Sequence, residues 1–193
     1  MGRPSLREKI LTEGLKVVHE RGFGAASVRD IVRAAGVPQG SFTNHFASKE
    51  AFGLEILELY FAGARQAMDE TLRNDALPPL QRLGAYIDHT MAPDGQPEPG
   101  RGCLIGNFSA EVGEHSEALR GRLLEIFAEV RAALAYCLRA AVDAGELPAD
   151  FDVDDVAAFI QAGLQGATLM AKAERDCAAV ARFKDRLFRS VLR

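Results

Sequence analysis

The sequence predicts an all-α fold of about nine helices, with an N-terminal three-helix helix-turn-helix domain followed by a C-terminal helical domain. Apolar residues recur with helical spacing along most of the 193-residue chain, whereas strand signals are nearly absent. A hydrophobic content of 48% is enough to build a sizeable core. The Gly- and Pro-rich stretch at 92–102 predicts a loop between helices, and Pro148–Asp152 predicts a further break. We place the domain boundary between residues 47 and 48.

The segment Ser27 to Lys49 predicts two short helices joined by a tight turn. Ser27 and Asp30 have the spacing of a capping box at the start of the first helix, which carries Arg29 on its outer side. Gly36 supplies the left-handed residue that ends this helix, and Pro38 is expected at the first position of the next one. This arrangement is typical of a helix-turn-helix, whose second helix enters the major groove of DNA.

The second helix of this segment has an apolar side and a polar side. Val37, Phe42 and Phe46 are the expected core anchors, which leaves four residues facing away from the core: Gln39, Gly40, Thr43 and Asn44. Gln and Asn can bond adenine in bidentate fashion, Thr offers a hydroxyl and a methyl group, and Gly permits close approach. The pattern predicts DNA binding; the alternative is a small helical hairpin with an ordinary polar surface.

The same segment resembles the DNA-binding domain of the TetR family of one-component repressors. The similarity runs from Arg7 through Phe52 and includes the pattern S-V-R-D-I-V-x-A-A-G-V-P-x-G-S-F-x-x-H-F-x-S-K-E-A-F. The resemblance implies that eight residues meet bases or phosphates: Arg29, Gln39, Gly40, Ser41, Thr43, Asn44, His45 and Lys49. The family commonly has Tyr at the position of Thr43, so the phosphate contact of that phenol is missing or replaced here.

The charge is divided unevenly along the chain. Residues 1–49 carry a net charge of +4, so the remainder of this chain of net charge -4 carries -8. A basic module on an acidic body concentrates the attraction for phosphate at one end. Chance clustering of charges is the alternative interpretation.

The chain beyond Ser48, a predicted N-cap, reads as successive helices. The first of them is expected to link the DNA-binding domain to the body and to turn Phe52, Ile56, Leu59 and Tyr60 inward. The expected helices cover residues 48–74, 80–91, 103–112, 116–144, 152–173 and 176–192. We interpret residues 48–193 as an effector-binding and dimerisation domain.

The last two helices predict self-association. Small residues permit close helix approach at Ala158, Ala162, Gly163, Gly166 and Ala167, and they are flanked by apolar Phe159, Ile160, Leu164, Leu169, Phe183, Leu187 and Phe188. We expect two helices from each subunit to pack as a four-helix interface, and the resemblance implies the same two-fold dimer. The alternative is that these residues only fill the monomer core. A dimer would hold two recognition helices about 34–36 Å apart and so predicts a near-palindromic operator.

The segment Arg101–Glu111 contains the first candidate sensor. Cys103 is expected in the first turn of a helix, where the helix dipole and Arg101 would favour the thiolate. This arrangement resembles a subgroup of the family typified by NemR, which contains electrophile- and oxidant-sensing repressors with a Cys in the same G-C-L context and a late Lys. The resemblance implies that Cys103 is the sensor and Lys172 its partner. The alternative is a thiol that fills a core.

A conventional ligand pocket competes for the same region. An apolar cavity with a few hydrogen-bonding groups suits a small ligand, and the residues that would supply it are Tyr86, His89, Met91, Asn107 and Phe108. Cys103 would then be a wall residue. The sequence therefore predicts either a small-molecule inducer or a reactive electrophile as effector.

Several classes of protein are not indicated. The chain has no bilayer-length apolar stretch and no signal-peptide pattern, so we expect a cytoplasmic protein. Cys103, Cys137 and Cys177 lack the spacing of a zinc site or disulfide scaffold, and we expect no cofactor or metal. No catalytic motif of the GxSxG, P-loop or HExxH type is present, so we do not expect an enzyme.

These observations converge on a TetR-type repressor that a small-molecule or electrophile/oxidant signal releases from a palindromic operator. The expected partners are double-stranded operator DNA, a second copy of the chain and the inducer. The alternative is a purely helical dimeric adaptor without DNA binding.

Overall fold

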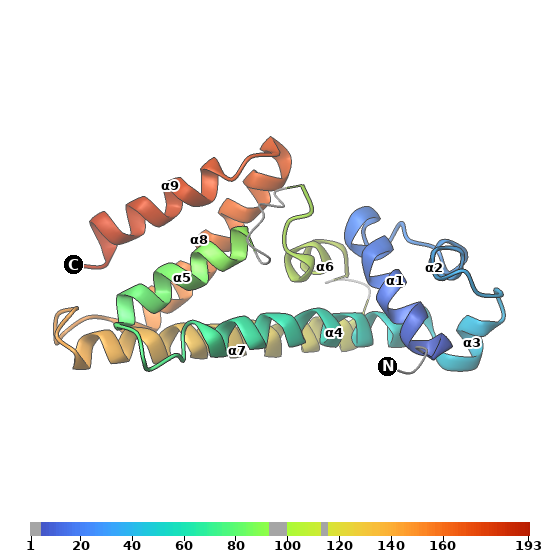
Figure 1. Ribbon diagram of the computed structural model, residues 1–193, viewed down its shortest axis with the longest axis horizontal. Coiled ribbons are helices and arrows are strands. Elements are labelled where there is room, and N and C mark those ends of the chain that lie inside the picture. Colours follow the sequence, from blue (N-terminus) through green and yellow to red (C-terminus); the bar gives the residue numbers. More distant parts are fainter. Residues whose placement is uncertain (1–4, 93–99, 113–115) are drawn as a thin grey trace. The chain divides into compact units, whose positions relative to one another are not determined.

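The structure is a computed structural model that describes residues 5–92, 100–112 and 116–193. All regular elements in these ranges are helical, as predicted (Figure 1). The chain forms two compact units. Unit 1 comprises Met1–Ala62 and Leu104–Leu124, and unit 2 comprises Gly63–Cys103 and Glu125–Arg193. The proposed boundary after residue 47 stays a prediction, because the compact units divide the long helices α4 and α7 internally.

Unit 1 begins with α1 (Leu6–Arg21) and α2 (Val28–Ala35). The predicted capping box is present, because Asp30 N donates to Ser27 Oγ at 3.1 Å and Ser27 N donates to Asp30 Oδ2 at 3.2 Å. Asp30 Oδ2 also accepts from the Ser27 hydroxyl, and this bond, followed by the one from Ser27 N, lowers the pKa of the Asp30 carboxyl. Gly36 ends α2 with φ 61°, the left-handed conformation expected of it.

The start of α3 (Ser41–His45) corrects one prediction. Pro38 was expected at its first position, yet the helix begins three residues later. Pro38 O accepts from Ser41 N at 2.9 Å in a turn that precedes the helix. Gly40 follows within this turn, and glycine lowers the helical propensity of so short a segment.

Helix α4 (Lys49–Glu70) starts where Ser48 Oγ accepts from Ala51 N at 3.0 Å, as the predicted N-cap requires. Phe52 at its start packs on two rings of the α3 region, with centroids 5.2 Å from Phe42 and 5.1 Å from Phe46. All three rings are buried. This aromatic cluster forms the floor under α3.

Two expectations for α4 are wrong. The helix ends at Glu70 rather than near residue 74, and Leu59 is exposed at 43% instead of facing inward. Leu57 and Phe61 are buried in its place. At about 100° per residue, Leu59 falls just outside the arc that Phe52 and Phe61 bound, and an amphipathic pattern does not fix the edges of such an arc.

Unit 1 also contains α6 (Leu104–Val112) and the first part of α7 (Glu117–Asp143). Cys103 was expected within the first turn of α6 but precedes the helix. Ser116 Oγ accepts from Leu119 N at 3.1 Å and so caps α7 near the predicted start. Of the predicted loop 92–102, residues 93–99 lie outside the described residues.

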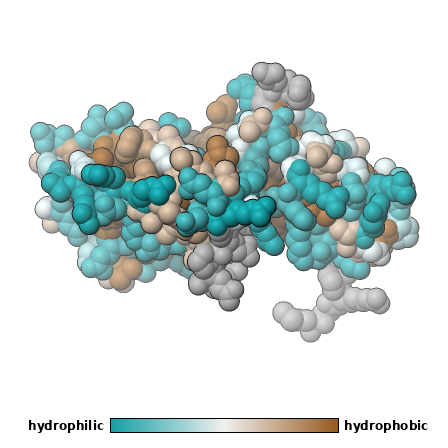
Figure 2. All heavy atoms as spheres, turned by 90° about the horizontal axis from the view of Figure 1, so that it is seen from above, coloured by the Kyte–Doolittle hydropathy of each residue, from teal (hydrophilic) through white to brown (hydrophobic). Residues whose placement is uncertain are grey.

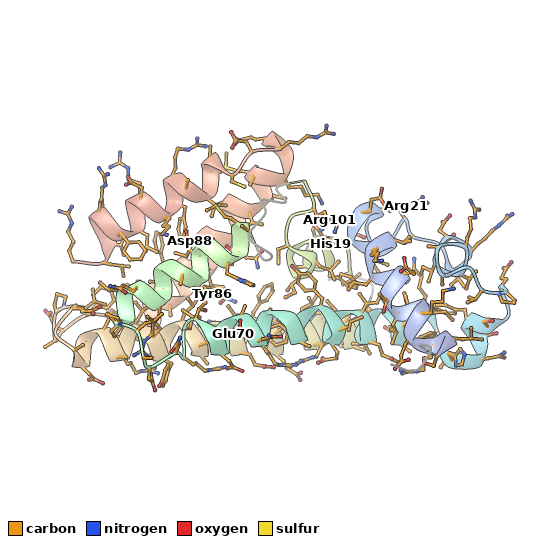
Figure 3. All side chains as sticks on the ribbon, in the orientation of Figure 1. His19, Arg21, Glu70, Tyr86, Asp88 and Arg101 are labelled. Atoms are coloured by element: carbon orange, nitrogen blue, oxygen red, sulfur yellow. The ribbon has the colours of Figure 1, made fainter. Side chains whose placement is uncertain are left out.

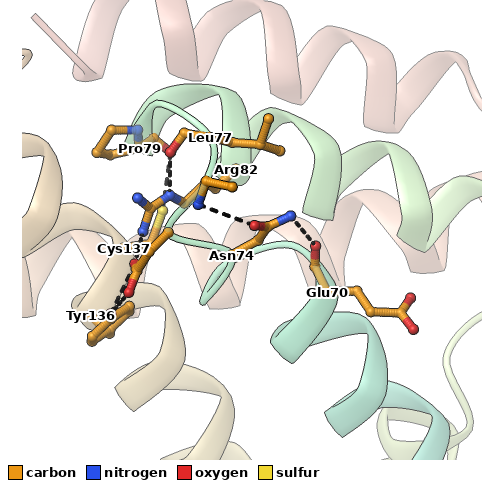
Figure 4. A network of polar contacts seen from close by, with 9 residues as sticks. Glu70, Asn74, Leu77, Pro79, Arg82, Tyr136 and Cys137 are labelled. Atoms are coloured by element: carbon orange, nitrogen blue, oxygen red, sulfur yellow. Dashed lines mark hydrogen bonds and ion pairs between the residues drawn. The ribbon is translucent and has the colours of Figure 1, made fainter.

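Unit 2 contains α5 (Pro79–Met91), α8 (Val153–Glu174) and α9 (Ala178–Arg186), which continues as a π-helical turn (Leu187–Val191). Asp152 is the N-cap of α8, and its side chain accepts from Asp155 N at 3.1 Å. Buried Arg82 organises the connection before α5 (Figure 4).

Among the described helices, α8 carries the most exposed large apolar side chains. Figure 2 shows one face of the molecule, on which hydrophilic residues predominate and apolar residues form smaller groups. Among the described residues, the large apolar side chains that are exposed are Leu6, Leu59, Leu77, Leu124, Tyr136, Phe159, Leu169 and Met170. Three of these belong to α8, which therefore has the largest share of uncovered apolar surface.

Candidate DNA-binding and effector sites

The outer surface of α3 and of the turn before it consists of polar residues. Phe42 is buried against the floor under α3, and five of the predicted contact residues are exposed: Gln39, Gly40, Thr43, Asn44 and His45. Thr43 Oγ1 donates to Gly40 O at 3.1 Å, which leaves the hydroxyl oxygen able to accept and the methyl group available. Ser41 differs from them, because it is only 9% exposed and its side chain offers little to DNA.

Two arginines on α2 complete the exposed polar surface of the helix-turn-helix. Arg29 and Arg33 are both exposed and four residues apart, so they lie on the same side of the helix. Guanidinium groups so placed suit phosphate oxygens.

Lys49 occupies a different setting from the one expected. It is half-buried, its Nζ donates to Gly24 O at 3.2 Å, and the same atom lies 4.8 Å from the centre of the Phe23 ring. Burial lowers the pKa of Lys49, while the charge of Glu111 opposes that effect. The Lys49 side chain, at the start of α4, thus binds the turn between α1 and α2 within unit 1.

Cys103 and Lys172 both lie next to Gly102 in unit 2. Cys103 is half-buried, and its Sγ accepts from Gln165 Nε2 at 3.5 Å. Gly102 has φ 65°, and a Cβ there would meet Lys172 Cδ at 3.0 Å. The aliphatic part of Lys172 therefore lies against the residue that precedes Cys103.

Tyr86 is a neighbour of Cys103 in unit 2. It is buried on α5 (Figure 3), and burial, together with the nearby Cys103 thiol, raises the pKa of its phenol to about 12. His89 is half-buried one turn later on the same helix. Tyr86 therefore stays a neutral hydrogen-bonding group at ordinary pH.

Two of the remaining three predicted pocket residues, Asn107 and Phe108, lie on α6 in unit 1. Phe108 is fully buried, with its ring 4.8 Å from that of Phe23. In unit 2, a surface groove of about 380 Å³ lies along α5 and α9 and is lined by Asp88, Met91, Ala181, Lys184, Asp185, Phe188 and Arg189. Met91 is the one residue that it shares with the predicted pocket.

Two polar residues near these sites were not identified from sequence. Glu111 accepts from Gly24 N at 2.7 Å across a separation of 87 residues, which no local pattern reveals. Gln165, the donor to Cys103, is one of a few polar residues in a mostly apolar stretch of α8, which is only a weak signal.

Metal and membrane sites are not found in the part of the chain that the structure describes. There, no group of three or more His, Cys, Asp or Glu side chains could hold a metal ion. No helix in the described ranges combines the length and apolarity needed to cross a bilayer.

Two family profiles match the chain. The profile for "Bacterial regulatory proteins, tetR family" matches residues 10–56, and that for "Tetracyclin repressor-like, C-terminal domain" matches residues 79–187. The chain is also 36% identical over 192 residues to the HTH-type transcriptional repressor DhaR of Mycobacterium sp. (strain GP1), covering 100% of this chain and 95% of that protein.

Solved structures have the same fold. The reduced form of NemR from Escherichia coli is similar with a TM-score of 0.82 and 29% identity over 94% of each chain. A cysteine mutant of the TetR family regulator CifR, in complex with 26-bp double-strand operator DNA, has a TM-score of 0.82 and 26% identity, and the match covers 98% of this chain and 100% of that one.

These relatives are transcriptional regulators rather than enzymes, and they do not favour the alternative of a helical adaptor. The helix-turn-helix at residues 27–49 lies within the matched N-terminal profile, and the body from α5 to α9 lies within the C-terminal one. The chain belongs to the TetR family of bacterial transcriptional regulators, with a DNA-binding N-terminal domain and a helical C-terminal domain.

Proposed function

We propose that the protein is a homodimeric repressor that binds a near-palindromic operator through α3 and releases it when an effector acts on the C-terminal body. The observation that carries this proposal is the exposed polar row on α3 above a buried aromatic floor. The operator complex of the similar regulator CifR supports it. We expect such a regulator to act in the cytoplasm and to have no catalytic activity.

Direct base contacts are assigned to Gln39, Thr43 and Asn44, whose side chains are exposed on one surface. Gly40 permits close approach, and Arg29 and His45 lie where phosphates would pass. Lys49 keeps a smaller role, because its ammonium already bonds Gly24 O but retains further donors. Ser41 contributes through packing.

Dimerisation is assigned to α8 and α9. Phe159, Ala162, Gly166 and Leu169 are exposed at intervals of three and four residues, which places them along one side of α8. A Cβ on Gly166 would meet nothing within 4 Å, so this position is open to a second chain. Gly163, in contrast, is used within the chain, because a Cβ there would lie 2.4 Å from the Phe183 ring.

The effector is proposed to act at Cys103. The half-exposed thiol, its contact with Gln165 and the nearby chain of Lys172 support an electrophile or oxidant sensor. NemR, one of the similar proteins, has been solved in a reduced form, which is in keeping with thiol chemistry in that relative. A conventional small-molecule pocket at Tyr86 and His89 of unit 2 is the other effector class that we propose.

Operator binding tests the proposed function directly. An operator can be selected from random double-stranded DNA, and its Kd measured by fluorescence anisotropy over a range of salt concentrations. We expect the selected operator to bind about a thousandfold or more tighter than scrambled DNA. The logarithm of the binding constant should fall linearly with the logarithm of the salt concentration. Equal affinity for selected and scrambled DNA would overturn the proposal.

Two substitutions separate base reading from phosphate binding. Gln39→Ala is expected to relax the preference at one position of each half-site at a cost of about 1–3 kcal/mol. Arg29→Ala is expected to weaken binding to all sequences alike and to lower the salt slope by about one. If both variants change specific and scrambled binding equally, the assignment of Gln39 is wrong.

A further inference from the structure

The turn between α1 and α2 is held on both sides by charged side chains from other helices of unit 1. Gly24 is the residue they share. Its N–H donates to Glu111 Oε2 of α6 at 2.7 Å, and its carbonyl accepts from Lys49 Nζ of α4 at 3.2 Å. The peptide groups of one residue thus connect α6, α4 and the α1–α2 turn.

The backbone around Gly24 leaves room for the carboxylate. Gly22 has φ 88°, and a Cβ on it would lie 2.5 Å from Glu111 Oε1. A side chain at this position would therefore displace the carboxylate as well as strain the turn. The position of the Glu111 carboxylate therefore depends on the backbone conformation of this turn and on the absence of a side chain at Gly22.

An aromatic contact reinforces the same connection. The Phe23 ring lies 4.8 Å from the ring of Phe108 on α6, centroid to centroid, and Lys49 Nζ lies 4.8 Å from the Phe23 centroid. Gly53 on α4 makes space for this ring, because a Cβ there would meet Phe23 at 2.7 Å. The turn is fixed by packing as well as by hydrogen bonds.

The turn sets where α2 begins and hence where the DNA-binding surface lies. Ser27, the N-cap of α2, follows Gly24 by three residues, and α3 follows α2 after a short connection. We propose that Glu111 is a positioning residue for operator binding: by holding the Gly24 amide, it ties the α2–α3 pair to α6. This proposal rests on the proposed function and adds to it, since α6 starts directly after Cys103 and a displaced α6 would pull on this bond.

Electrostatics alone predicts that removal of Glu111 changes DNA affinity in the direction opposite to that expected from a positioning role. Loss of a carboxylate near a basic DNA-binding module reduces repulsion of phosphate and should strengthen binding to any DNA. Loss of a positioning bond should instead weaken binding to the operator and leave scrambled DNA little changed. The direction of the effect therefore distinguishes the two roles.

Three variants of Glu111 separate the effect of the side chain's charge from the effect of its length. Glu111→Leu removes both, Glu111→Asp keeps the charge on a shorter side chain, and Glu111→Gln keeps an acceptor of full length without charge. We expect Glu111→Leu and Glu111→Asp to weaken operator binding by about tenfold or more, as loss of a charge-assisted hydrogen bond allows. Glu111→Gln should retain most of the affinity.

The matched control is Glu117→Gln on α7. Glu117 is an exposed carboxylate in the same unit that pairs with its neighbour Arg120 at 2.6 Å. Its loss changes the net charge as Glu111→Leu does without touching the turn. We expect operator binding equal to, or slightly tighter than, that of the parent. Circular dichroism checks that each variant is folded.

A spectroscopic signature tests the bond itself. In a ¹H–¹⁵N correlation spectrum of the full-length protein, the Gly24 amide proton should move upfield in Glu111→Leu and Glu111→Asp and much less in Glu111→Gln. Should Glu111→Leu fail to fold, Glu111→Asp gives the same comparison.

The outcomes are distinguishable. If the parent prefers its operator but Glu111→Leu and Glu111→Asp bind it as tightly or more tightly, the positioning role alone is overturned. An unchanged Gly24 resonance in both variants overturns it too. A parent protein without any operator preference overturns the proposed function, and with it this role.

Discussion

Arg82 is a cationic side chain enclosed by unit 2, and its partners explain why it is tolerated there. The side chain is 7% exposed, its Nε donates to Leu77 O at 2.6 Å, and its Nη1 pairs with Asp75 Oδ1 (Figure 4). Asp75 itself is 68% exposed and accepts from the Tyr136 hydroxyl at 3.0 Å. Arg82 thus satisfies a carbonyl of the α4–α5 connection, while its carboxylate partner remains in water.

The two members of this ion pair should differ in their effect on stability. Arg82→Leu leaves the Leu77 carbonyl without its donor and is expected to cost about 1–3 kcal/mol of unfolding free energy. Asp75→Asn removes a solvent-screened partner and should cost less than about 1 kcal/mol. Urea unfolding followed by circular dichroism measures both. Equal losses would show that the ion pair, rather than the carbonyl cap, dominates.

The conformation of a single residue could be predicted from sequence where it depends on neighbours in the chain. The capping box of Ser27 and the left-handed Gly36 depend on residues within one turn, and both are present. The settings of Lys49 and Glu111 depend on contacts with Gly24 that are 25 and 87 residues away, so no neighbouring pattern specified them. The base-contact assignments on α3 remain predictions.

Helix packing in unit 1 depends on places where a side chain is missing. Gly14 on α1 lies so close to Phe52 and Ile31 that a Cβ would meet their side-chain carbons at 2.5 and 2.9 Å. The sequence predicted a three-helix N-terminal domain followed by α4, but it did not reveal which glycine sets the distance between α1, α2 and α4. Such distances arise from the tertiary fit of three helices, which a one-dimensional pattern does not contain.

Replacing helical glycines by alanine should therefore have opposite effects at two positions. Gly14→Ala is expected to lower the unfolding free energy, because overpacking costs about 1–3 kcal/mol and exceeds the gain in helix propensity of about 1 kcal/mol. Gly63→Ala, in an exposed part of α4 where a Cβ meets nothing within 4 Å, should raise it by up to about 1 kcal/mol. Denaturant titration compares the two variants. Stabilisation of both would mean that α1 moves away at little cost.

The whole molecule as proposed is a dimer, and its α8 surface explains why. Gly166 lies in the row of exposed small and apolar residues that includes Phe159 and Leu169. Gly166→Arg should give monomers by light scattering and weaken operator binding by orders of magnitude, because one half-site supplies only half of the contacts. Gly121→Arg on α7, another helical position with nothing within 4 Å, is the control and should remain dimeric. A dimeric Gly166→Arg protein would place the interface elsewhere.

In the proposed function, a change at the C-terminal body releases operator DNA from the N-terminal domain. The three cysteines allow the reactivity of the proposed sensor to be compared with that of two other thiols in the same protein. Cys137 is buried, and burial raises its pKa to about 11, so little thiolate forms below about pH 9 and it should resist alkylation in the folded protein. N-ethylmaleimide should therefore label half-exposed Cys103 before Cys137, and labelling should release the operator in the parent but not in Cys103→Ser.

Cys177 is half-buried as well, so mass spectrometry of peptides after brief labelling has to rank all three thiols. Lys172→Ala should blunt release by hypochlorite more than release by N-ethylmaleimide. Alkylation of sulfur needs no amine, whereas the sulfenic acid that hypochlorite forms from the thiol can condense with an amine to a sulfenamide and release water. Anisotropy of labelled operator DNA reports both responses. A Cys103→Ser protein that is released as fully as the parent would exclude the thiol and leave the small-molecule pocket around Tyr86 as the effector site.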